Sequence, residues 1–223
     1  MRFSFLFLFA TLMFGSISSS WGDLTVTQVI EERNDEELLD KEVMTIFVKG
    51  NAVRIDQGQA LSSIIRNDRK LTYSIMHSPK KYVVLKHGKL DESDESHEAE
   101  DFEGLEVEST GKTEEISGYA THQVLVKERN GDATELWISE GALDMNLFLK
   151  EFKSFIQFGF VQSASLLEKH PELKGVPIRI IETQGKINRK GTITRLDTSI
   201  LPDSLFEVPA GYAEIKNAEE FDP

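Results

Sequence analysis

Apolar and polar residues alternate along most of this chain, and one segment breaks that pattern. Strict alternation is typical of β-strands with one buried face. In residues 143–158 (LDMNLFLKEFKSFIQF) the apolar residues recur at helical spacing instead. On a helix, six of them fall within an arc of roughly 120°, namely Met145, Phe148, Leu149, Phe152, Phe155 and Ile156. The pattern predicts one Phe-rich amphipathic helix lying against a mostly antiparallel sheet.

The first 22 residues are typical of a secretory signal peptide. Arg2 precedes an apolar run over residues 3–14, and small residues, Ser20 and Gly22, stand just before Asp23. The run is shorter than the roughly 18 to 20 residues that span a bilayer, so an uncleaved anchor is the less favoured alternative. With no cysteine in the chain, a disulfide and an acylated cysteine anchor are both excluded. We expect an exported protein without a stable membrane span, in a bacterial periplasm or fully secreted.

The charge of the chain is acidic and unevenly placed. There are 25 Lys and Arg against 38 Asp and Glu, and the predicted signal peptide contains only Arg2, so the mature part carries a net charge of −14. Ten acidic residues and no Lys or Arg lie between Asp91 and Glu108. The rest is mildly acidic, so nucleic acid and an anionic membrane surface are poor electrostatic partners.

The alternating segments predict about ten short strands in an antiparallel meander. The first strand begins at Leu24, and residues 34–41 are interpreted as a polar connector. The later strands are expected at 43–48, 52–56, 61–66, 71–76, 82–86, 105–112, 116–122 with its continuation at 123–128, 133–138, 178–183 and 191–198. So many short strands require a strongly curved sheet or two packed sheets. We expect a single domain over residues 23–216, with the helix at 143–158 inside the curvature and an acidic tail at 217–223.

Residues 88–104 are rich in acidic side chains and poor in apolar ones, which predicts a flexible acidic loop. The alternative is a metal site that uses His87, His97 and the carboxylates. Their spacing fits neither an EF-hand nor a zinc-ligand pair on one helix face, so we expect no metal and no cofactor.

Three stretches resemble a known family. They are TGKTEEISGYATHQVLV (110–126), ELWIS (135–139) and SLFEVPAGY (204–212), in which the matching residues are Ile116, Gly118, Tyr119, Trp137, Phe206, Pro209, Gly211 and Tyr212. They resemble uncharacterised exported bacterial proteins catalogued as a domain of unknown function within the LolA-like superfamily, which includes periplasmic lipoprotein carriers. Members often carry a cysteine where this chain has Thr121. The resemblance implies an incomplete, half-open β-barrel whose lid helix covers an apolar hollow, and in the carriers that hollow receives acyl chains.

The familiar catalytic patterns are missing from the mature sequence. It has no cysteine nucleophile, no Gly-x-Ser-x-Gly elbow and no His-Glu-x-x-His. The Gly111–Thr113 segment lacks the first glycine of a phosphate loop, because Glu106 stands there. His77, His122 and His170 are interpreted as isolated surface or turn residues. We therefore expect a protein that is not an enzyme.

Two functions remain. The first is binding of a lipid, an acyl chain or another apolar small molecule between the sheet and the lid, through the six apolar helix residues. The second is an envelope interaction or structural protein with a filled core, acting through a protein partner. Fold analogy alone does not decide between them.

Overall fold

The computed structural model describes residues 23–35, 37–86, 106–127, 133–143 and 170–216. Twelve strands are hydrogen-bonded in the order β12-β6-β5-β4-β3-β2-β1-β11-β10-β9-β8-β7. Their bounds are β1 (Leu24–Asn34), β2 (Glu37–Lys49), β3 (Ala52–Gln57), β4 (Leu61–Arg66), β5 (Leu71–Met76), β6 (Lys81–Lys86), β7 (Glu106–Ile116), β8 (Tyr119–Lys127), β9 (Ala133–Ser139), β10 (Val176–Gln184), β11 (Ile187–Asp197) and β12 (Ala213–Glu214). The described residues include three 3₁₀ helices, η1 (Asn67–Arg69), η3 (Pro171–Leu173) and η4 (Asp203–Phe206), and no α-helix.

The chain packs as two compact units. Unit 1 contains the described residues of Glu31–Asp40 and Asp91–Thr192, and unit 2 contains those of Phe14–Ile30, Lys41–Leu90 and Ile193–Pro223. Strands β1, β2 and β11 contribute residues to both units. A single domain over residues 23–216 stays a prediction.

Unit 2 is built around the meander from β2 to β6. Each strand pairs antiparallel with the next, and the register places Phe47, Arg54, Ile64 and Tyr73 in one row across four strands. We call the face that carries this row face A, and the opposite face, which carries the row Ile46, Ile55, Ser63, Ser74 and Val83, face B.

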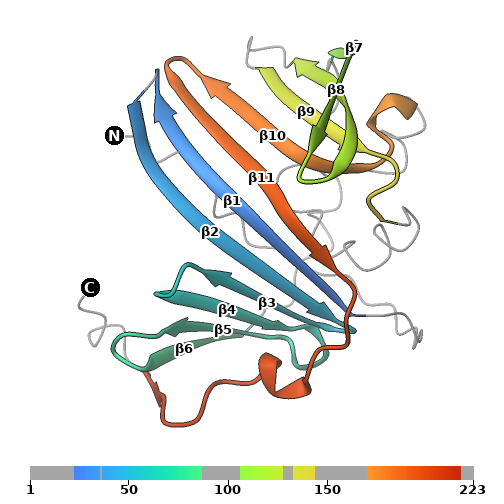
Figure 1. The fold of residues 1–223 in the computed structure, drawn as a ribbon. Coiled ribbons are helices and arrows are strands. Elements are labelled where there is room, and N and C mark those ends of the chain that lie inside the picture. The colour runs from blue at the N-terminus through green and yellow to red at the C-terminus, as the bar shows by residue number, and fades with distance from the viewer. Residues whose placement is uncertain (1–22, 36, 87–105, 128–132, 144–169, 217–223) are drawn as a thin grey trace, which may run out of the picture. The chain divides into compact units, whose positions relative to one another are not determined.

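The C-terminal segment covers face A. Phe206, at the end of η4, is buried together with Ile64 and Ile75, and Tyr73 and Tyr82 pack around them. The segment then runs along β6 as β12, which pairs parallel to it. Figure 1 shows the segment in red beside the four strands β3 to β6. Face A is therefore an ordinary hydrophobic core, closed by the chain's own end.

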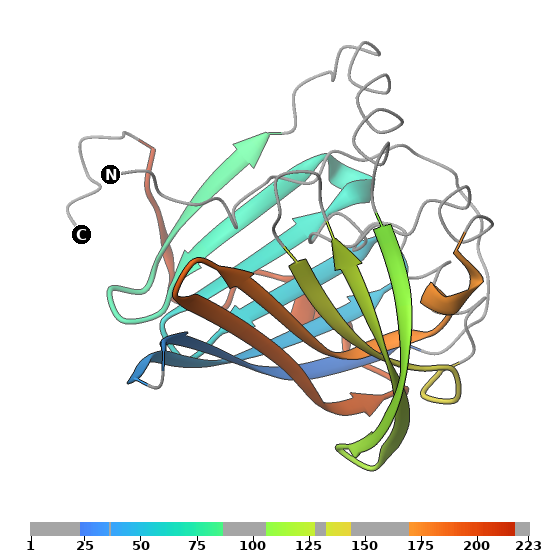
Figure 2. The same ribbon diagram turned by 90° about the horizontal axis from the view of Figure 1, so that it is seen from above.

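Unit 1 is built around the antiparallel strands β7 to β11. Its core contains Val124, Val126, Leu136 and Ile138, and Leu173 of η3 packs on them. The β7–β8 hairpin turns at Ser117 and Gly118, whose φ values of 53° and 83° are both positive, as a type I′ turn requires. Figure 2 shows this hairpin in green, with β9 and β10 following on one side only.

Most strand predictions are confirmed, and the differences have physical reasons. Residues 37–41 belong to β2 and are not a connector; all five are exposed, so the segment shows no alternation. The break that was expected after Lys112 is a bulge within β7, and the turn comes later, at Ser117. The sheet has twelve strands instead of about ten, and the short β12 makes it not wholly antiparallel.

Several predicted segments lie outside the described residues. They are the signal peptide, the acidic loop at 88–104, the acidic tail at 217–223 and the lid helix at 143–158, of which only Leu143 is described, in a bend. No described helix has the length and apolar character needed to cross a membrane.

Candidate functional site

Face B of unit 2 is a largely apolar surface. Ten apolar side chains belong to it, which are Met44, Ile46, Val48, Val53, Ile55, Leu61, Ile65, Met76, Val83 and Leu85. The strands β2 and β3 therefore carry apolar residues on both faces, which strands do when both faces are covered. All side chains that pack around Phe206 belong to face A or to the C-terminal segment, so this segment leaves face B to another cover.

Burial varies across face B. Val48 and Val53 are 2% and 3% exposed, whereas Leu61 and Leu85 are 43% and 38% exposed. Two small residues, Ser63 and Ser74, are directly paired on β4 and β5 in the middle row of face B. Their small, polar side chains interrupt an otherwise apolar surface. Such a surface suits an acyl chain, since binding would remove more apolar area from water.

A chain of hydrogen bonds on face A joins the meander to the C-terminal segment. The Ser62 hydroxyl lies 2.5 Å from Asp56 Oδ1 and 2.7 Å from His77 Nε2, and His77 Nδ1 lies 2.7 Å from the Tyr212 hydroxyl. Asp56 also accepts a hydrogen bond from Arg54 Nε at 2.7 Å. Because the Asp56 carboxylate only accepts, Ser62 must donate to it. His77 then donates a hydrogen bond from Nε2 to Ser62 and accepts one at Nδ1 from the Tyr212 hydroxyl.

This chain of hydrogen bonds resembles a catalytic arrangement in its residue types but not in its geometry. A nucleophilic serine must give its proton to the histidine. Here the Ser62 hydroxyl donates its hydrogen bond to Asp56, and Ser62 is only 2% exposed. The contacts instead fasten Tyr212, the last residue of the Phe-x-x-Pro-x-Gly-Tyr ending, to β4. The prediction that His77 is an isolated residue is therefore wrong.

Ion pairs hold the same segment at two further points. Arg66 contacts Asp68 at 2.8 Å and Glu207 at 2.7 Å. The hydrogen bond with Asp68, and then that with Glu207, raises the pKa of Arg66, and the hydrogen bond from Arg66 lowers the pKa of Asp68. At the second point Lys49 Nζ lies 2.8 Å from Asp203, and this hydrogen bond raises the pKa of Lys49 and lowers that of Asp203.

Unit 1 carries a polar cluster next to its hairpin. The Arg179 guanidinium lies 6.0 Å from the Trp137 ring centroid and donates to Glu114 at 3.1 Å. The indole Nε1 of Trp137 donates to Glu135 at 2.6 Å. Thr121 is buried and donates to the Glu114 carbonyl at 2.7 Å. A small, partly polar side chain is therefore accommodated at this position.

The other two histidines also have partners. His122 Nε2 donates to the Glu172 carbonyl at 3.0 Å, and His170 Nδ1 lies 3.2 Å from the Glu172 carboxylate. The interpretation of both as isolated residues is wrong, because their partners come from η3. Within the described part of the chain, no three His, Asp or Glu side chains gather in a way that could hold a metal ion.

The six residues that the sequence predicts as an apolar ligand surface lie outside the described residues. They are Met145, Phe148, Leu149, Phe152, Phe155 and Ile156. Face B was not singled out from the sequence as a site. The available signal was the uninterrupted apolar run at 46–48, which indicates burial on both faces.

Comparisons with known proteins give a family and distant fold likenesses. A family model described as "Domain of unknown function (DUF4412)" matches residues 33–212. No curated protein is significantly similar to this chain.

Three solved structures illustrate the fold likeness. An uncharacterised conserved protein from Thermus thermophilus is 9% identical, with a TM-score of 0.48, and the match covers 88% of this chain and 91% of that one. A LolA superfamily protein from Nitrosomonas europaea is 10% identical, with a TM-score of 0.36 and coverages of 85% and 91%. The MucA/MucB complex of Pseudomonas aeruginosa matches with 10% identity, a TM-score of 0.43 and coverages of 83% and 56%. Every one of these TM-scores lies below 0.5, so shared function does not follow from them.

Proposed function

Because this chain belongs to the DUF4412 family, as its residues 110–126 and 204–212 indicated, we propose that it is a non-catalytic exported protein that binds a lipid, an acyl chain or another apolar ligand. Face B is the binding surface in this proposal. The observation that carries it is the asymmetry of the meander in unit 2. One face is closed by the chain's own C-terminal segment, and the other presents ten apolar residues that this segment does not cover.

The partial exposure of Leu61 and Leu85 supports a ligand surface over a completely filled core. Leu61 begins β4 and Leu85 lies near the end of β6, so the apolar area of face B that is still exposed lies at its margins, where a ligand would cover it. Leu61 lies in the same register row as the well-buried Met44, and Leu85 lies in the same row as the well-buried Val48. The predicted lid residues at 143–158 lie outside the described residues apart from Leu143, and their part in ligand binding stays a prediction.

The non-catalytic part of the proposal is supported by the Ser62 network. Among the described residues, Ser62 and His77 come nearest to a pair of nucleophile and base. The Ser62 hydroxyl, however, donates its hydrogen bond to Asp56 and not to His77. Export, with a periplasmic location, rests on the sequence of residues 1–22.

The experiment places a bulky side chain in the middle of face B. In the Ser74→Trp variant an indole replaces the small side chain in the middle of the apolar surface. Ser78→Trp is the control, because Ser78 is exposed in the neighbouring turn. Binding of the fluorophore N-phenyl-1-naphthylamine is measured by titration, and native mass spectrometry of the gently purified protein reports any lipid that copurifies.

The proposal expects the wild type and Ser78→Trp to bind the fluorophore, and Ser74→Trp to lose most of that binding at an unchanged circular dichroism spectrum. If the wild type excludes the fluorophore and copurifies with no lipid, the ligand-binding function is wrong. If Ser74→Trp unfolds the protein, the smaller Ser74→Val change is used. A large loss of stability with no change in fluorophore binding would then favour a filled core.

A role through a protein partner is the second candidate. The observation that favours it is the outer edge of β7 in unit 1, which has no partner among the described strands and is separate from face B.

A further inference from the structure

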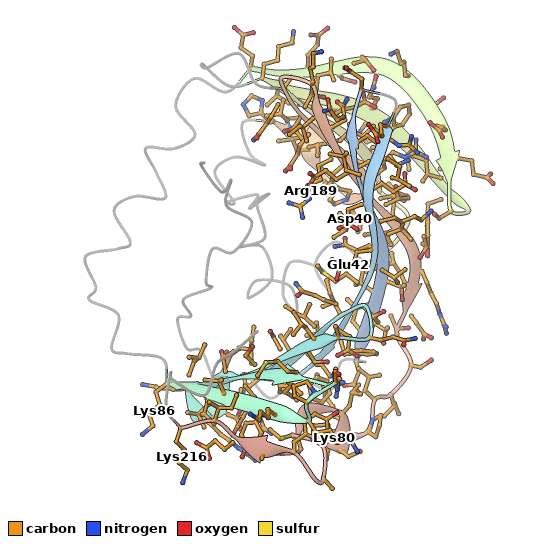
Figure 3. The ribbon with its side chains drawn as sticks, turned by 90° about the vertical axis from the view of Figure 1, so that its left-hand side faces the viewer. Asp40, Glu42, Lys80, Lys86, Arg189 and Lys216 are labelled. Atoms are coloured by element: carbon orange, nitrogen blue, oxygen red, sulfur yellow. The ribbon has the colours of Figure 1, made fainter. Side chains whose placement is uncertain are left out.

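The two end strands of the sheet differ in how well they are protected. At one end β12 has only two residues, and lysines such as Lys86 and Lys216, labelled in Figure 3, lie along this edge. A short strand and lysine side chains are common means of preventing another chain from pairing. At the other end β7 has 11 residues, eight of which are exposed. Among the described strands no partner pairs with the outer edge of β7, and this edge is the longer and more accessible of the two.

The hairpin geometry indicates which backbone groups of β7 are free. In a two-residue hairpin the pair that flanks the turn, here Ile116 and Tyr119, is hydrogen-bonded, and the bonded pairs then alternate along the strands. Glu114 is in the next bonded pair. The N–H and C=O groups of Thr113 and Glu115 consequently point away from β8. These four groups can bind a further strand.

A shallow depression of about 560 Å³ adjoins this edge. It is lined by Thr113, Glu114, Glu115, Ala120, Thr121, His122, Glu140 and Gly141, among which there are three carboxylates and no Lys or Arg. Glu114 is paired with Arg179, whereas the structure records no partner for Glu115 or Glu140 among the described residues. Since no metal-binding cluster occurs in the described ranges, an ammonium or guanidinium group is the cation that suits these carboxylates.

We propose that β7, from Thr113 to Ile116, binds an extended Lys- or Arg-rich segment of a partner protein as an additional strand, with one cationic side chain in the depression. Backbone hydrogen bonds would provide affinity and the carboxylates would select a basic segment. A second copy of this chain is a poor occupant, because pairing two β7 edges would bring Glu114 and Glu115 of both copies together. The bulge at residues 110–112 confines regular pairing to the stretch near the hairpin.

The test uses a fluorescein-labelled peptide of alternating Lys and Thr, eight residues long, and measures fluorescence anisotropy at low salt. Charge is tested with Glu115→Lys, which is expected to weaken binding about tenfold. The matched control is Glu37→Lys, the same charge reversal at an exposed strand residue of unit 1, which is expected to have no effect. Similar weakening by both variants would overturn the proposal.

Strand addition is tested separately from charge. Two versions of the peptide are N-methylated, one at its odd-numbered residues and one at its even-numbered residues. Each version lacks the backbone N–H donors along one of its two edges and keeps its charge. Thr113→Pro removes an outward N–H of β7, a position where edge strands tolerate proline. One of the two methylated peptides is expected not to bind. The Thr113→Pro variant is expected not to bind the unmethylated peptide. If both methylated peptides bind like the parent, the contact is only electrostatic and the proposal fails.

A measurement on the unmodified protein protects the test against misfolded variants. Hydrogen exchange at the Thr113 and Glu115 amides is expected to slow when the peptide is added. Unchanged exchange at both amides while the peptide is bound would place the peptide elsewhere and refute strand addition at β7.

Discussion

Replacing Phe206 by alanine tests whether the C-terminal segment is part of the core of unit 2. Phe206 is 2% exposed and packs against Ile64 and Ile75 on face A. The backbone of the same segment is also held by hydrogen bonds from Ala213 N to the Lys80 carbonyl at 2.9 Å and from Ile215 N to the Tyr82 carbonyl at 2.8 Å. The segment should therefore stay docked and leave a cavity that neighbours fill only in part. Truncation of a buried Phe to Ala costs about 3 to 5 kcal/mol of unfolding free energy.

The assay is urea unfolding followed by circular dichroism, with Ile200→Ala as the control. Ile200 belongs to the same stretch of chain and is 87% exposed, so its truncation should change the unfolding free energy by less than about 0.5 kcal/mol. The slope of the free energy against urea concentration should be the same for the wild type and both variants. If Phe206→Ala costs no more than Ile200→Ala, the segment is not a core element and the assignment of face A is wrong.

Three further predictions concern single contacts. Tyr212→Phe removes the donor to His77 Nδ1 and should cost about 1 kcal/mol in urea unfolding; no loss would mean that the hydrogen bond is absent in solution. Gly175→Ala should lower the melting temperature strongly, because φ is +139° and a Cβ would lie 2.5 Å from Ile138 Cγ2; Gly141→Ala, where a Cβ meets nothing within 4 Å, should not. The Asp203 pKa is lowered by Lys49 from its ordinary value of 3.8, so the pair stabilises the folded state above that pH and loses its effect as acid protonates Asp203; Asp203→Asn should flatten this acid-side dependence, and an unchanged pH profile would contradict it.

The sequence predicts unit 2 well where alternation and turn residues agree. Strands β4 and β5 match the predicted 61–66 and 71–76 residue for residue, because turn residues at 67–68 and 78–79 bound the segments and the apolar positions 71, 73 and 75 alternate in β5. Alternation fails in the first part of β2, where Glu37 to Lys41 are all exposed and no buried face imposes a pattern. The two-residue β12 is too short to have any period.

Contacts between residues that are far apart in the chain could not be predicted from the sequence. The partners of His77 are 15 residues before it and 135 residues after it, and nothing local at residues 76–78 indicates either of them. Face B could be described only once the pairing register placed ten apolar residues from five strands on one side. The family resemblance at 110–126 and 204–212 identified the end of the chain as important without revealing that Phe206 and Tyr212 close face A.

The position of Phe206 after the strands that it covers has a consequence for biosynthesis. A ribosome makes residues 206–215 long after β4 and β5, so Ile64 and Ile75 have no cover until the later segment has been made. A nascent chain in that state would expose an apolar surface, and a copy truncated before residue 206 would keep it exposed permanently. Quality-control proteases would then be expected to remove incomplete copies and spare finished ones.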